Sequence, residues 1–158
     1  MIIINTPSGR FTYRVAGIAI VDDHILLHKA ASDDYWILPG GRAEMMEQAR
    51  TTLQREMLEE TGLHVNVGRL VWITENFFVQ DEVRFHEIGL YFEMNTPTDS
   101  LAGQSLSFMG QEGSKPIEFR WCPLDDLPAF QPHFLSERLA YLPAATEHVV
   151  HPAPASVV

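Results

Sequence analysis

The sequence predicts an α/β domain in which helices pack on a mixed β-sheet, and three observations lead to this class. Several segments rich in β-branched and aromatic residues are separated by turn residues, which is typical of strands. Residues 46–61 contain no glycine or proline and repeat their apolar residues at helical spacing. A second, shorter apolar repeat at helical spacing follows residue 132. Strands mixed with two helices favour a layered α/β architecture.

Length and composition bound the function. The 158 residues, 46% hydrophobic and 20% charged, suit one globular domain over residues 1–158. The net charge of −10 argues against DNA as a partner, because clustered cations provide most nucleic-acid affinity. A phosphate-bearing ligand is still possible if metal ions accompany it. The single cysteine excludes an internal disulfide and a multi-cysteine zinc site.

No apolar run reaches the roughly 18 residues of a membrane helix, so no membrane association is expected. The first residues lack the basic head and apolar stretch of a signal peptide. We therefore expect a cytoplasmic protein.

The first half of the chain is predicted to contain a hairpin, a loop and a helix. Residues 13–28 are rich in β-branched residues and contain an Asp-Asp turn signal, which predicts a hairpin. Residues 30–43 have the polar, glycine- and proline-containing composition of a loop. A helix is expected over 46–61, and Gly62 follows it where a left-handed C-terminal cap belongs.

The second half is predicted to alternate strands with one long loop. In chain order we expect strands over 65–78 and 83–94, a loop over 95–116 with a short turn around 101–108, a strand over 117–122 and a C-terminal helix over 134–142. Long loops inside compact domains are often functional. The tail, residues 148–158, is rich in alanine, proline and valine and is expected to be flexible unless a neighbour orders it.

Three glutamates carry the clearest chemical signal. On the predicted helix, Glu56, Glu59 and Glu60 stand at i, i+3 and i+4, so their carboxylates share one face. Like charges this close repel one another, and a surface helix gains nothing from them. A hard divalent cation reverses the sign of the interaction, since Mg²⁺ prefers carboxylate and water oxygens. The pattern therefore indicates a metal site.

The residues before these glutamates extend the pattern. Arg55 lies four residues before Glu59 and eight after Glu47, so it can pair with either carboxylate or hold the loop at Gly40 and Gly41. Two adjacent glycines allow that loop to approach the helix or a ligand closely.

The full pattern, residues 41–63, is Gly-x5-Glu-x7-Arg-Glu-apolar-x-Glu-Glu-x-Gly-apolar. A solvated acidic helix face would explain a lone pair of glutamates. Seven fixed positions, however, match by chance with a probability on the order of 10⁻⁹ per start. The segment resembles the Nudix box at every fixed position, and most of residues 11–142 is similar to a Nudix domain.

The resemblance implies a fold, a cofactor and roles for the box residues. It implies an α/β/α sandwich with a mixed sheet between helices, and hydrolysis of nucleoside diphosphates linked to another group with Mg²⁺ or Mn²⁺. By the same resemblance the three box glutamates hold the metal, and Glu59 or Glu56 orients the attacking water. Arg55 and Glu47 organise the site, while Gly41 positions the loop against the helix.

Many members of the family use a further carboxylate from outside the box as metal ligand or general base. Glu118, on the strand before Trp121, is the first candidate. Glu112, in the preceding loop, is the second, and Glu87 is the third.

Candidate substrate contacts are Arg14, which suits phosphate, and the aromatic residues Trp36 and Phe78, which suit a base. The subgroup marker of ADP-ribose enzymes is absent, because Phe78 or Val79 stands where a proline is usual. The tyrosine of diadenosine polyphosphate enzymes is also absent. The partner is therefore expected to be a small nucleotide-like substrate of unspecified kind, and a homodimer is compatible with the sequence.

Three other functions were weighed. A non-catalytic metabolite sensor of the same fold commonly lacks box glutamates, and all are present here. An RNA-end pyrophosphohydrolase is disfavoured by the net charge of −10 and the absence of a Lys/Arg cluster. A simple metal chelator would leave Arg55 and the two glycines unexplained.

Overall fold

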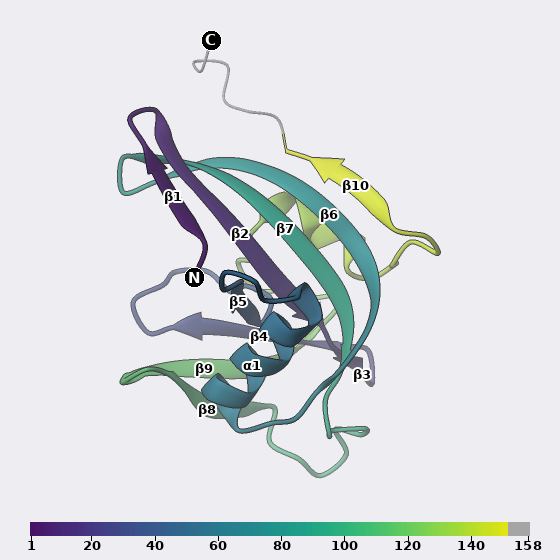
Figure 1. Ribbon diagram of the computed structural model, residues 1–158. Coiled ribbons are helices and arrows are strands. Elements are labelled where there is room, and N and C mark those ends of the chain that lie inside the picture. Colours follow the sequence, from purple (N-terminus) through teal and green to yellow (C-terminus); the bar gives the residue numbers. More distant parts are fainter. Residues whose placement is uncertain (152–158) are drawn as a thin grey trace.

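The computed structural model describes residues 1–151, which form two β-sheets, one α-helix and one 3-10 helix (Figure 1). The larger sheet contains β1 (Ile3–Thr6), β2 (Gly9–Ile18), β5 (Gly40–Arg42), β6 (Asn66–Gln80), β7 (Val83–Asn95) and β10 (Glu147–Val150). The smaller sheet contains β3 (Ile20–Val21), β4 (His24–Ala30), β8 (Ser107–Glu112) and β9 (Lys115–Pro123). The helices are α1 (Ala49–Thr61) and the 3-10 helix η1 (His133–Arg138).

Strand pairing in the larger sheet brings distant segments together. Its order is β1-β2-β7-β6-β10, with β5 paired to β2. Strands β6 and β7 form a long antiparallel pair, whereas β2 runs parallel to β7 and β10 parallel to β6. This register places Thr12, Glu87 and Asn76 in one row across three strands. Side chains in such a row point to the same face of the sheet.

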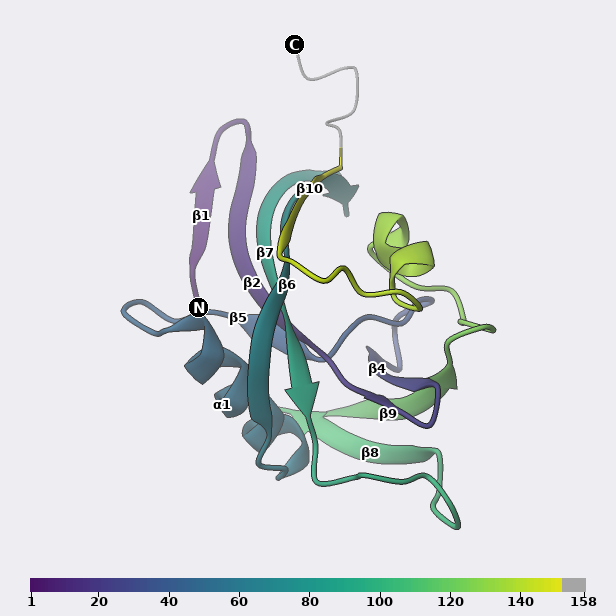
Figure 2. The same ribbon diagram turned by 90° about the vertical axis from the view of Figure 1, so that its right-hand side faces the viewer.

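The helices lie on opposite sides of the larger sheet, as Figure 2 shows, with α1 on one side and the coil of η1 on the other. Leu53 and Met57 of α1 are fully buried against Val15 and Phe92 in one apolar cluster. A second apolar cluster forms between the sheet and η1, around Trp72. The predicted mixed α/β class is confirmed. Within the described residues no helix is long and apolar enough to cross a membrane.

Helix α1 begins three residues later than predicted. Met46 has a φ of +67°, and Gln48 is extended at φ −75° and ψ 144°, so residues 46–48 belong to the loop. The predicted end is confirmed, because Gly62 has a φ of +72° and its N–H donates to the Leu58 carbonyl.

The predicted hairpin over 13–28 is only partly formed. Asp22 and Asp23 have φ values of +48° and +57°, which confirms the tight turn. Antiparallel pairing around it is confined to β3 and β4, with Ile20 opposite Ile25. Residues 13–18 instead continue β2 and pair with β7, because the chain leaves the larger sheet at Ala19 and enters the smaller one.

The prediction of a continuous loop over 95–116 is wrong. Residues 107–112 form β8, which pairs with β9 through a turn at Gly113, where φ is +59°. The strand has a weak apolar pattern because its buried position is Gly110, which has no side chain to signal burial.

The C-terminal region also differs from the prediction. In place of an α-helix over 134–142, a short 3-10 helix covers 133–138, with Leu135 and Leu139 buried. Residues 147–150, which overlap the start of the predicted tail, form β10 and pair with β6. The rest of that tail, residues 152–158, lies outside the described residues.

The two fully buried residues of α1 should dominate its contribution to stability. Leu53→Ala or Met57→Ala should lower the free energy of unfolding by about 2–5 kcal/mol, because each leaves a cavity in a packed cluster. Leu58→Ala on the same helix is the control, since Leu58 is 43% exposed and should change stability much less. Denaturant titration measures all three variants. Equal effects at Leu53 and Leu58 would contradict the orientation of α1.

Candidate active site

Arg55 fastens the loop that precedes α1 to the helix itself. Its Nε and Nη2 donate to the two carboxylate oxygens of Glu47 at 2.8 and 3.0 Å, and Nη2 also donates to the Arg42 carbonyl at 3.3 Å. Glu47 accepts further hydrogen bonds from the Glu44 N–H and the Thr52 hydroxyl. Hydrogen bonding from Arg55 lowers the pKa of Glu47 to about 2. The structure thus brings together the two residues expected to organise the site.

The same guanidinium also reaches two box glutamates. Arg55 Nη1 donates to Glu56 at 2.8 Å and to Glu59 at 3.1 Å. Gly41 allows the loop to lie directly on Glu56, since a Cβ at this position would overlap the Glu56 carboxylate. The preceding Gly40 has a φ of +147°, a conformation that favours glycine. The two glycines therefore set how closely β5 approaches α1.

Glu60 is the third box glutamate and lies in a different environment. It is 6% exposed, and its Oε2 has no hydrogen-bond partner among the described residues. This oxygen lies 3.7 Å from Nδ1 of His28, a buried histidine on β4 whose ring nitrogens also lack partners. Burial raises the pKa of Glu60 to about 8, with a further contribution from Glu56, and burial lowers the pKa of His28 to about 3. The sequence analysis did not identify His28, because nothing local in its strand marks it.

These carboxylates fit a hard cation by their chemistry. Within the described residues no three His, Cys, Asp or Glu side chains form a ready-made metal cluster. The contacts explain why: Arg55 is bonded to Glu56 and Glu59, while Glu60 lies against His28. An unpartnered buried carboxylate oxygen is costly, and a divalent cation held by all three glutamates would satisfy it.

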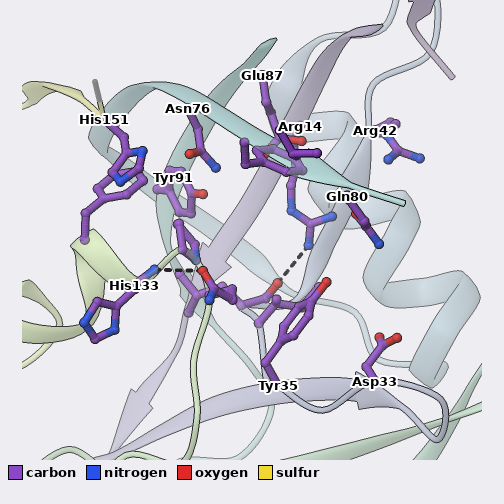
Figure 3. Close-up of a pocket in the computed structure, with 17 residues that line it drawn as sticks. Arg14, Asp33, Tyr35, Arg42, Asn76, Gln80, Glu87, Tyr91, His133 and His151 are labelled. Atoms are coloured by element: carbon purple, nitrogen blue, oxygen red, sulfur yellow. Dashed lines mark hydrogen bonds between the residues drawn. The ribbon is translucent and has the colours of Figure 1, made fainter. Parts of the chain in front are cut away.

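A cavity of about 430 Å³ lies on the face of the larger sheet that η1 covers (Figure 3). Its floor includes Asn76, Glu87 and Tyr91 from β6 and β7. Its walls include Asp33 and Tyr35 from the loop after β4, Gln80 at the end of β6, and His133 and Phe134 from η1. The cavity is of the size that small-molecule sites have.

Arg14 and Arg42 stand side by side at this cavity, opposite each other in the pairing of β2 with β5. Arg14 donates to the Leu38 carbonyl at 3.0 Å, whereas Nε of Arg42 is buried without a partner. Within residues 1–151 neither guanidinium forms an ion pair. Burial, and then the charge of Arg14, lower the pKa of Arg42. Two adjacent cations without counter-ions form a site suited to an anion.

Arg14 also links the cavity to the box. Its charge lowers the pKa values of Glu56 and Glu60, against the larger effect of burial, which raises them. The sequence analysis identified Arg14 but not Arg42. The feature of the sequence that could have pointed to Arg42 is its position directly after Gly40 and Gly41.

Of the two predicted aromatic contacts, the structure brings only Phe78 to the cavity, where its ring stacks on Phe85 at 4.8 Å. Trp36 is 5% exposed, lies outside the cavity lining and has the guanidinium of Arg120 over its ring at 4.7 Å. Lys29 approaches the same ring at 5.4 Å. Trp36 therefore serves the core and a cation–π contact in this structure, and the expected contact with a base is not supported.

Glu118 points away from the box. It pairs with Arg120 at 2.5 Å on the side of β9 that faces Trp36. The neighbouring Phe119 points the opposite way and packs on the His28 ring at 5.1 Å. Alternation along the strand thus separates the first candidate for an additional carboxylate from the box glutamates.

Glu112 lies on the face of β8 that is turned toward α1 and its box glutamates. Gly110, two residues earlier on β8, is so close to α1 that a Cβ there would collide with the backbone oxygen of Glu60. The charge of Glu112 raises the pKa of Glu60, after the larger effects of burial and Glu56. The third candidate, Glu87, lies on the cavity floor.

A family model described as the NUDIX domain matches residues 11–142. The chain belongs to the Nudix family. Its Nudix relatives include YvcI of Bacillus subtilis (strain 168), named an uncharacterized Nudix hydrolase, with 28% identity over 106 residues that cover 67% of this chain and 62% of YvcI. The 8-oxo-dGTP diphosphatase of Buchnera aphidicola subsp. Schizaphis graminum is 25% identical over 146 residues, covering 90% of this chain and 92% of that protein.

Solved structures share the Nudix fold. The crystal structure of a UDP-X diphosphatase superposes with a TM-score of 0.65 at 20% identity, covering 92% of this chain and 68% of that chain. The chain spans between 39% and 62% of the length of the first three curated relatives it matches. The resemblance seen in the box is thereby confirmed at the level of family and fold.

The raised pKa of Glu60 predicts how the stability of the metal-free protein depends on pH. Between its ordinary value of 4.5 and about 8, the unfolded chain releases the Glu60 proton and the folded protein keeps it, so the free energy of unfolding falls as pH rises. His28 acts in the opposite sense, but only below 6.5, where the unfolded chain binds a proton that the folded protein excludes.

A net fall is therefore expected between pH 6.5 and 8, and Glu60→Gln should flatten it. Denaturant titration in the presence of chelator, over this pH range, measures the slope. An unchanged slope in the variant would show that Glu60 does not keep its proton in the folded protein.

Proposed function

We propose that this Nudix protein is a pyrophosphohydrolase that uses a divalent cation to cleave the diphosphate linkage of a small nucleoside diphosphate derivative. One observation carries the proposal: two arginines without ion pairs among the described residues line a cavity, and the charge of one of them, Arg14, acts on Glu56 and Glu60 of the box. Cations and carboxylates in one neighbourhood suit a diphosphate that arrives together with a metal ion.

Arg14 and Arg42 bind the diphosphate in this proposal. A guanidinium offers a planar fork of donors that matches phosphate oxygens, and a buried guanidinium Nε without a partner gains a hydrogen bond from an anion. An anion would also relieve the repulsion that lowers the pKa of Arg42. The group that the diphosphate carries then occupies the adjoining cavity.

Glu56, Glu59 and Glu60 hold the cation, either Mg²⁺ or Mn²⁺. When bound, the cation neutralises phosphate charge and makes a water more acidic. Glu59 or Glu56 accepts the proton of the attacking water. Arg55 limits where both carboxylates can move, because it is fixed at its other end by Glu47.

Glu112 supplies the carboxylate from outside the box. Its place on the α1 side of β8, near Glu60, supports this assignment, and the opposite orientation of Glu118 argues against the earlier choice. The names of relatives that act on 8-oxo-dGTP and UDP-X support a small nucleotide-like substrate.

The proposal is tested with a panel of nucleoside diphosphates, nucleoside triphosphates, nucleotide sugars and dinucleoside polyphosphates. At least one should be hydrolysed with Mg²⁺ or Mn²⁺, and excess EDTA should abolish turnover, because without the cation no bound water is made acidic enough for the attack. Identification of both products locates the cleaved bond. Turnover that continues in chelator would exclude the metal mechanism, and binding without turnover of any compound would indicate a sensor.

Glu-to-Gln substitutions distinguish the roles of the individual carboxylates. On a substrate from the panel, Glu60→Gln should lower kcat about 10²-fold or more, equivalent to about 2.7 kcal/mol, because it removes a charge that binds the cation. Glu112→Gln should also lower kcat, whereas Glu118→Gln, a matched change on the neighbouring strand, should leave it near normal. The reverse order at Glu112 and Glu118 would return the assignment to Glu118.

A further inference from the structure

Glu87 is a buried carboxylate that the steps above do not use. It is 8% exposed and lies on the cavity floor, where Figure 3 shows it beside Arg14 and Asn76. Within the described residues its one hydrogen-bond donor is the Thr12 hydroxyl, which bonds to Oε2 at 3.0 Å. A carboxylate can accept about four hydrogen bonds, so most of this capacity faces the cavity unused.

Asn76 extends this polar floor. It is directly opposite Glu87 in the pairing of β6 with β7, is 9% exposed and lines the same cavity. Its amide offers both a donor and an acceptor. Buried polar groups are rarely left without partners, because each costs free energy comparable to a lost hydrogen bond. The cavity floor therefore suits a ligand whose hydrogen-bonding groups reach both Asn76 and Glu87.

Glu87 could instead be only a counter-ion for the two arginines. Its charge does raise the pKa of Arg42, although burial and Arg14 act on that group in the opposite direction and burial dominates. Within residues 1–151, however, Glu87 forms no ion pair with Arg14 or Arg42. The hydroxyl of Thr12 holds the carboxylate on the floor, apart from both guanidinium groups.

We propose that Glu87, assisted by Asn76, determines substrate specificity by accepting two hydrogen bonds from adjacent donors on the group attached to the diphosphate. This inference rests on the proposed function, because it takes Arg14 and Arg42 as the diphosphate site. A carboxylate fork matches two neighbouring donors and rejects an acceptor, whose lone pairs it repels.

Two parts of a nucleotide present such a donor pair. The first is the guanine edge, where a ring N–H and an amino group stand side by side, with a carbonyl next to them that an Asn76 amide can meet. The second is the cis-diol of a ribose. Adenine, cytosine and uracil edges present no two adjacent donors, so the base and the sugar can be distinguished by experiment.

The test measures equilibrium binding of GDP, dGDP, ADP and dADP in chelator, by calorimetry, to the wild-type protein and to Glu87→Gln. The variant keeps the shape of the side chain but replaces one acceptor oxygen with a donor. If Glu87 binds the guanine edge, GDP and dGDP should lose about tenfold or more in affinity while ADP and dADP change little. If it binds the ribose diol, GDP and ADP should weaken while both deoxy forms change little.

Inorganic pyrophosphate is the probe for the counter-ion alternative. It reaches the arginines but carries no donor pair, so its affinity should be unchanged in Glu87→Gln, whereas removal of a counter-ion that competes for the arginines would raise it. An equal change, in either direction, for pyrophosphate and all four nucleotides would overturn the inference, as would unchanged affinity for all five or no binding of the nucleotides to the wild-type protein.

Two further variants complete the design. Glu93→Gln is the matched control, because Glu93 lies on the same strand, outside the cavity lining, and pairs with Arg69 at 3.2 Å. Thr12→Val removes only the hydroxyl that positions Glu87 and should weaken the same nucleotides to a smaller extent, which keeps the test valid if Glu87→Gln is unstable. If no compound is hydrolysed but Glu87→Gln still weakens only the guanine nucleotides or only the ribonucleotides, recognition by Glu87 is supported and the proposed hydrolysis is not.

Discussion

The repulsion between three carboxylates on one turn of α1 is the constraint that shapes the site around it. Arg55 offsets it for Glu56 and Glu59, and can do so only because Glu47 holds the other edge of its guanidinium. That pairing fixes the loop before the helix, and the loop in turn requires glycine where it lies on Glu56. Glu60, to which Arg55 donates no hydrogen bond among the described residues, has its pKa raised to about 8 by burial and then by the charge of Glu56.

The cations form a complementary arrangement on the other side of β5. Strand pairing holds Arg14 and Arg42 together in a chain whose net charge is −10, and within residues 1–151 neither guanidinium forms an ion pair. Two neighbouring guanidinium groups give an acidic protein a place suited to an anion, although Asp33 and Glu87 line the same cavity. Backbone pairing of β2 with β5 keeps Arg14 and Arg42 opposite each other, although their positive charges repel.

The parts of the site that sequence predicted are those made by local contacts. Arg55 and the three glutamates lie on one helix, so helical spacing places them together, and Glu47 lies only eight residues before Arg55 in the preceding loop. His28, Arg42 and Glu87 were missed or given another role, because their positions depend on strand register between distant segments. The preference for Glu118 over Glu112 was made without knowledge of β8, whose buried residue is a glycine and leaves little apolar pattern. The directions in which the two glutamates point follow from the pairing of β8 with β9, and activity measurements have to decide between them.

The site also divides along the chain. The groups assigned to the chemistry come chiefly from residues 14–60, whereas the cavity floor and far wall come from β6, β7 and the segment after residue 130. Two portions of the polypeptide thus perform separable tasks, although they meet where β2 pairs with β7, where Leu53 packs with Phe92, and where Trp36 bonds to residues 129 and 131. Substitutions in the later portion can change which molecule is held while the earlier portion keeps its reaction. The architecture therefore allows one reaction to diversify over many metabolites without rebuilding the part that performs it.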